Sequence, residues 1–190
     1  SLPTYASGPT SVGWWAVWIT MLGDSTAFAS LVFGFFFYWT ARPDFITIGA
    51  DHATGAAVAL GVTLFVVSWA ATLLAREVNK RSHITLARLA LAGAATCTVG
   101  GAGLIILSVL DLEPTTHVYP ATMWALMVWL VAHALLGVIM QLYALAGSIF
   151  GKVTAQYDAD LCNVTLFWHF MVLTALVTGF ILGVAPRLLA

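Results

Sequence analysis

Residues 13–38 read GWWAVWITMLGDSTAFASLVFGFFFY, a run that contains a single charged side chain, Asp24. An α-helix needs about 20 predominantly apolar residues to cross the roughly 30 Å hydrocarbon core of a bilayer. This stretch is long enough, and its aromatic ends are typical of helices that meet the membrane–water interface. We therefore predict that the stretch is a transmembrane helix.

The composition of the whole chain agrees with this interpretation. Of the 190 residues, 61% are hydrophobic and only 8% are charged, whereas a soluble domain carries about 25% charged residues. Polar links, with breaks marked by Pro43, Pro114 and Pro120, separate five apolar runs. We expect residues 1–190 to form one all-α domain, a transmembrane bundle of five helices. The predicted spans are 13–38, 55–75, 86–110, 123–150 and 163–182.

The basic residues predict the direction of the bundle. Lys and Arg gather in cytoplasmic loops, and most of those in this chain lie on the N-terminal side of the predicted topology. That side holds Arg76, Lys80, Arg81, Arg88 and Lys152, and the other side holds Arg42 and Arg187. We therefore expect a multi-pass protein with a cytoplasmic N-terminus and a periplasmic C-terminus. The net charge of −1 offers no basic field for nucleic acid, so we expect no such partner.

Asp24 is the first candidate functional residue. It lies 11 residues into the first span, which is about 16 Å deep at a helical rise of 1.5 Å per residue. A carboxyl group at that depth is costly, and by default it is a functional hypothesis. The structural alternative, a neutral Asp hydrogen-bonded to a neighbouring helix, carries equal weight at this stage.

His133 and His169 are the second candidates, because two intramembrane histidines on consecutive helices can ligate one haem b. Depth argues against this pairing. His133 should lie about 15 Å from the outer edge of the bilayer and His169 about 9 Å from the inner edge. Across a core of about 30 Å, the two differ in depth by several ångströms. We expect both to be structural residues that hydrogen-bond between helices, and a small membrane cytochrome b with these two ligands remains the alternative.

Two further features concern helix packing. The third span is rich in Gly and Ala, which let helices approach closely, so we expect it inside the bundle or against a large partner helix. Gln141 lies within the fourth span, and we expect its amide to pair with a neighbouring helix.

Several short motifs, in order, give the chain a family resemblance. The first span places Asp24 after Gly23 and ends in the aromatic run 33–39. The second ends in Ser68-Trp69-Ala70 before a basic loop, the fourth contains His133-Ala134-Leu135-Leu136-Gly137, and the fifth contains Trp168-His169-Phe170. Together these resemble subunit III of the haem-copper cytochrome c oxidases, in a short five-helix bacterial form.

The resemblance has departures. The family usually has Glu after Ser where this chain has Asp24 after Gly23, a His where Leu130 stands, and often an Asp where Val172 stands. These departures indicate a divergent branch of the family. A fusion of subunits I and III in one gene would account for such a branch and for a chain that begins without Met. We do not expect a cleaved signal peptide, because residues 1–12 contain no Lys or Arg.

The resemblance implies a non-catalytic subunit that packs on oxidase subunit I, with subunit II in the same complex, in a bacterial inner membrane. Such a subunit supports proton uptake and stable turnover while the complex reduces oxygen to water. Haem and copper are then expected in the partner subunits, with no redox centre or metal in this chain, and membrane lipid, including bound phospholipid, is an expected partner. Asp24 is then the buried family carboxylate, and His133, Trp168 and His169 are structural. A transporter that uses Asp24 as a proton site is the third hypothesis.

Overall fold

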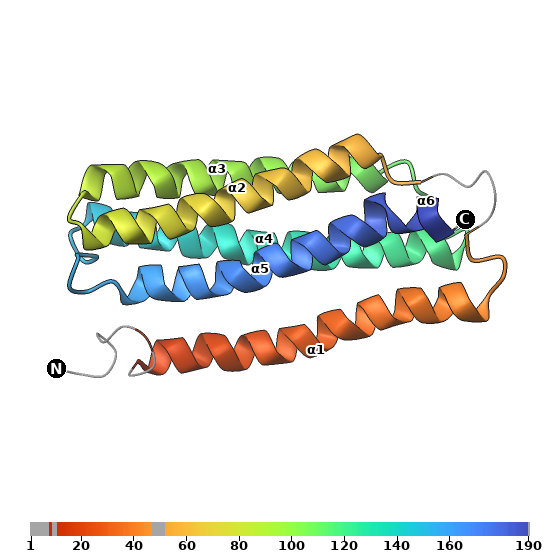
Figure 1. Ribbon diagram of the computed structural model, residues 1–190, viewed down its shortest axis with the longest axis horizontal. Helices are drawn as coiled ribbons and strands as arrows, with labels where there is room; N and C mark the ends of the chain where they lie inside the picture. Colours follow the sequence, from red (N-terminus) through yellow and green to blue (C-terminus); the bar gives the residue numbers. More distant parts are fainter. Residues whose placement is uncertain (1–7, 9–10, 47–51, 190) are drawn as a thin grey trace.

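The structure, a computed structural model, describes residues 8, 11–46 and 52–189. Within these residues it contains five helices that are long and apolar enough to cross a membrane, followed by one short helix (Figure 1). The all-α class and the five apolar helices are thus confirmed, while the direction in which they cross stays a prediction. The helices are α1 (Val12–Ala41), α2 (Gly55–Lys80), α3 (Ile84–Val109), α4 (Val118–Ile149), α5 (Ala159–Gly183) and α6 (Ala185–Leu189).

The start of α4 differs from the predicted boundary. The helix begins at Val118, whereas the span was expected from residue 123 because Pro120 was interpreted as a break. Pro120 instead lies in the first turn, where the backbone N–H that proline lacks has no partner within the helix in any case. His117, the residue before the helix, accepts a hydrogen bond at its Nδ1 from the backbone N–H of Tyr119, at 3.3 Å.

The five long helices do not contribute equally to the bundle. Helix α5 packs against α1, α2 and α4, and α3 packs against α2 and α4. The main contacts of α1 are with α4 and α5, and Figure 1 shows it at one edge of the bundle, apart from α2 and α3. Only one face of α1 is therefore covered, through Met21, Phe28 and Phe35.

The third span does not lie at the centre of the bundle, and the alternative, a position against a large partner helix, stays a prediction. In its most apolar window α3 is 33% buried, whereas α5 is 61% buried. The small residues of α3 serve mainly one interface: a Cβ added at Gly101 would lie 3.0 Å from the backbone oxygen of Gly61 in α2. At Gly93 and Gly103 an added Cβ would meet nothing within 4 Å. Small residues thus allow close approach to one neighbour without placing the whole helix at the centre.

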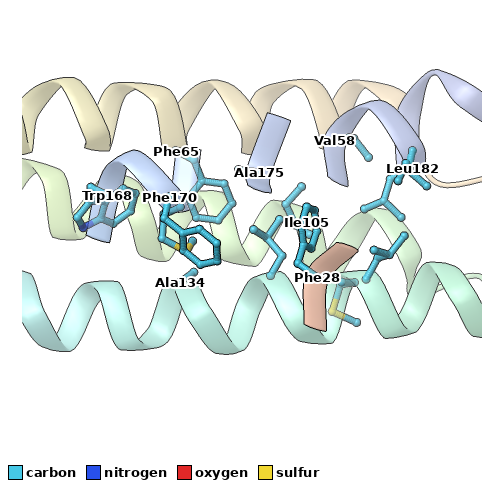
Figure 2. Close-up of a cluster of buried hydrophobic side chains, with 14 of the residues drawn as sticks. Phe28, Val58, Phe65, Ile105, Ala134, Trp168, Phe170, Ala175 and Leu182 are labelled. Carbon is cyan, nitrogen blue, oxygen red and sulfur yellow. The ribbon is translucent and has the colours of Figure 1, made fainter. Parts of the chain in front are cut away.

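Large side chains from every long helix fill the space around α5 (Figure 2). Trp168 is fully buried, and a Cβ added at Gly137 of α4 would lie 3.1 Å from its ring. Lipid chains are as apolar as this core, so van der Waals fit and interhelical hydrogen bonds hold such a bundle together. The predicted structural role of Trp168 agrees with this position.

Candidate functional site

Asp24 and His133 come together between α1 and α4. One carboxyl oxygen of Asp24, Oδ2, lies 3.5 Å from Nε2 of His133. The Asp24 side chain is 29% exposed and that of His133 is 13% exposed, so the contact lies at the edge of the interface and not at its centre. Both residues were sequence candidates, and here they form one site, the Asp24–His133 pair.

One ring hydrogen of His133 is placed by a hydrogen bond within α4. Nδ1 of His133 lies 2.8 Å from the backbone oxygen of Trp129, and a carbonyl oxygen can only accept, so Nδ1 carries a hydrogen. Nε2 is therefore the ring nitrogen that faces the carboxyl group of Asp24, at 3.5 Å. A polar neighbour of this kind lowers the cost of a carboxyl group within the membrane.

Aromatic rings enclose the histidine. Trp129 stacks on the His133 ring with centroids 3.9 Å apart, and Phe28 of α1 lies 4.7 Å from Trp129. The ring of Phe170 in α5 lies 6.3 Å from His133. These rings fix the imidazole in place, and the face of a Trp ring also favours a cation beside it. The rings therefore hold the imidazole beside the carboxyl group of Asp24.

His169 occupies a different surface. Its Nδ1 lies 2.7 Å from the backbone oxygen of Thr165 in the same helix, so the expected hydrogen bond to another helix is replaced here by one within α5. Its ring packs edge-on to Trp69 of α2 at 5.8 Å. The structure therefore brings His133 to Asp24 and does not bring it to His169.

The register of α4 and α5 gives the difference in depth between the two histidines. Gly137 faces Trp168 in the antiparallel pair of helices. His133, four residues earlier in α4, is thus level with residue 172, three residues or about 4.5 Å beyond His169. This offset agrees with the difference in depth expected from the sequence. A haem shared by both residues would also have to displace Asp24 from Nε2 of His133.

Gln141 lies at the centre of a second polar cluster, which is fully buried between α2, α3 and α4. Its amide nitrogen donates to the hydroxyl of Ser68 at 3.0 Å and to that of Thr72 at 2.9 Å. Its amide oxygen accepts from the hydroxyl of Thr98 at 3.2 Å. The prediction that Gln141 pairs across helices is confirmed. The network ties three helices together and has no titratable group, so its role is structural.

A third polar contact, at the end of α2, was not predicted from the sequence. Nε of Arg76 lies 3.3 Å from Oδ2 of Asp158, whose side chain is only 9% exposed. Nearby, the fully buried Asn79 donates to the backbone oxygen of Thr154 at 3.0 Å. Both contacts hold the segment before α5 against α2. The sequence shows which loop residues are charged, but it does not indicate which of them form ion pairs.

Within the described residues, no three His, Cys, Asp or Glu side chains cluster as a metal site would require. No family model matches the chain. No curated protein is significantly similar to it either.

Proposed function

We propose that the chain is a non-catalytic, subunit III-like component of a haem-copper terminal oxidase in a bacterial inner membrane. One observation carries the proposal: Asp24 and His133, which belong to two separate motifs of the family resemblance, lie 3.5 Å apart across α1 and α4. Two motifs that are distant in the sequence lie close together in space. This proximity supports the resemblance more strongly than the order of the motifs along the chain does. In this role the protein packs on subunit I, and haem and copper reside in the partner subunits.

The Asp24–His133 pair would act within this subunit by fixing α1 against the rest of the bundle. Helix α1 has few other polar ties, because Thr20, Thr26 and Ser30 hydrogen-bond only to their own helix backbone. A fixed α1 gives the subunit a rigid face for assembly, and stable assembly in turn supports proton uptake and sustained turnover in the complex.

Co-purification tests the proposal. The tagged chain is extracted from its native membrane in mild detergent, and its companions are identified by mass spectrometry and by reduced-minus-oxidised spectra. We expect a haem-copper subunit to accompany the chain, and the chain separated from it to show no Soret band. A stoichiometric haem b signal in the separated chain would instead support a small cytochrome b that uses His133 and His169.

Asp24→Ala tests the part played by the pair. We expect this variant to reduce the amount of chain bound to the oxidase, or to shorten the period of constant turnover, because α1 loses its polar tie. The haem spectrum should stay unchanged, since no residue here is expected to ligate haem. Thr26→Ala is the matched control, because the Thr26 hydroxyl is exposed and bonds only to the backbone of its own helix. A shifted haem spectrum for Asp24→Ala would contradict the proposal.

A further inference from the structure

The start of α4 is tied to two other parts of the chain at the same end of the bundle (Figure 1). Nε2 of His117 lies 3.7 Å from Oδ2 of Asp44, in the link that follows α1. The hydroxyl of Tyr119 lies 3.0 Å from Nδ1 of His52, just before α2, and the Tyr119 ring packs edge-on to Phe45 at 5.6 Å. The distribution of basic residues predicts that this end of the bundle faces the outside of the membrane.

The backbone of α4 determines which ring nitrogen of His117 carries the hydrogen. Nδ1 accepts a hydrogen bond from the backbone N–H of Tyr119 at 3.3 Å, and an N–H group can only donate. Nδ1 is therefore unprotonated, so in the neutral ring the hydrogen lies on Nε2, which faces the carboxylate of Asp44. The neutral imidazole thus suits both of its neighbours while it caps the N-terminus of α4.

A second proton on His117 can bind only at Nδ1, where it removes the acceptor of the Tyr119 N–H. Two N–H groups would then face each other, so the ring has to turn away and the cap is lost. Tyr119 is only 2% exposed, and a buried N–H without a partner is costly. Fraying of the first turn, which lets water reach this N–H, relieves that cost.

Few charged groups surround the His117 ring. Among the described residues, Asp44 is the only carboxylate in ion-pair contact with it. The carboxylate of Glu113, in the link before α4, instead accepts a hydrogen bond from the hydroxyl of Thr115 at 2.8 Å. On the far side of Tyr119 lie His52 and the guanidinium of Arg187, which donates to the backbone oxygen of Ala53 at 3.5 Å. These two groups add only positive charge, so Asp44 alone favours a protonated His117.

The attraction of Asp44 is weaker than the effects that oppose protonation. The His117 side chain is 38% exposed and that of Asp44 is 62% exposed, and such an ion pair shifts an equilibrium by less than about fivefold. Loss of a helix cap shifts the equilibrium by about fivefold in the other direction. A positive charge at a helix N-terminus adds a further factor of about two or more. Protonation of His117 therefore favours release of the cap.

We propose that His117 is an acid-sensitive cap, which below about pH 6 releases the first turn of α4 together with the contacts of Tyr119. Neutral His117 keeps the turn closed at higher pH, and the closed form is lost as the pH falls through the range in which histidine titrates. Opening loosens the attachment of Asp44, Phe45 and His52 to α4. The proposal goes beyond the proposed function and does not rest on it, since it uses only contacts within this chain.

Hydrogen exchange tests the proposal on the purified full-length chain, with any subunits that accompany it, at about pH 7.5 and about pH 5.5. The rates are corrected for the pH dependence of chemical exchange, and peptides from the start of α4 are compared with peptides from the middle of α5. We expect protection at the start of α4 to fall about fivefold at the lower pH, and protection in α5 to stay the same.

Two variants make the result specific to the cap. His117→Asn is the matched control, because Asn caps a helix without titrating, and its protection should be equal at both pH values. Asp44→Asn removes the charge that favours the protonated ring, so its protection should fall by more than that of the unaltered protein. A smaller fall in Asp44→Asn would overturn the proposal, because it would show that the ion pair and not the cap controls this end of the bundle.

Nitrogen NMR of protein labelled at histidine gives a measurement that needs no folded variant beyond the one used for assignment. We expect Nδ1 of His117 to be unprotonated at about pH 7.5 and protonated at about pH 5.5. A protonated Nδ1 at the higher pH would contradict the proposal. Unchanged protection in the unaltered protein, or an equal loss of protection in His117→Asn, would contradict it as well.

Discussion

The coupling between Asp24 and His133 can be measured with a double-mutant cycle. Asp24→Leu removes the carboxyl group, and His133→Phe keeps an aromatic ring on Trp129 but removes Nε2. Polar pairs between membrane helices contribute about 0.6 kcal/mol on average and at most about 1.7 kcal/mol in such cycles. The two polar groups of this pair lie 3.5 Å apart and are only partly exposed, so we expect a coupling of about 1 kcal/mol.

The assay is reversible unfolding in mixed detergent micelles, followed by tryptophan fluorescence, for the unaltered chain, the two single variants and the double variant. Asp24→Asn separates charge from hydrogen bonding, because its amide can still donate to Nε2 of His133. It should recover more than half of the stability lost in Asp24→Leu. A coupling below about 0.3 kcal/mol, the usual error of additivity, would refute the argument that the pair fixes α1.

Two other substitutions test the packing. In Gly179→Ala the new Cβ would lie 2.5 Å from Val62 of α2, so we expect a loss of about 1 to 3 kcal/mol of unfolding free energy from overpacking, relieved by adding Val62→Ala. Gly23→Ala, where a Cβ meets nothing within 4 Å, is the control and should not be destabilised in the same micelle assay, because Ala favours the helix more than Gly does. Arg76→Gln removes a charge-assisted hydrogen bond to the carboxylate of Asp158 and should cost about 2 kcal/mol, whereas adding Asp158→Asn should restore part of that stability in equilibrium unfolding. Equal stability of the single and double variants would contradict the importance of that ion pair.

The number of helices could be predicted from the sequence because hydropathy and length are properties of each segment alone. The ends of the helices were less predictable where one residue type is compatible with both a helix end and a position inside a helix. Pro120 ends a helix in most positions, yet it is tolerated in the first turn of α4. The position of each helix in the bundle was least predictable, since the glycines of α3 indicate a close neighbour but not how many neighbours there are.

The candidate site was predicted in its members but not in their pairing. Asp24 and His133 stand out because polar groups within a span are costly, but their contact depends on the rotation of α1 about its axis, which composition does not specify. The hydrogen-bond partners of Gln141 could not be predicted from the sequence, for a related reason. Membrane Ser and Thr side chains often bond to their own helix, as Thr96 does to Ala92, so Ser68 looked no different from them.

The attachment of α1 to α4 and α5 has a consequence for synthesis. Helix α1 leaves the ribosome before either of the two helices that it packs against. About 110 residues separate Asp24 from His133, and translation at roughly 5 to 20 residues per second leaves an interval of about 5 to 20 seconds between them. During that interval the carboxyl group of Asp24 lies in or beside the bilayer without the imidazole of His133 next to it. The favourable contact that fixes α1 against α4 can therefore form only after α4 has been synthesised.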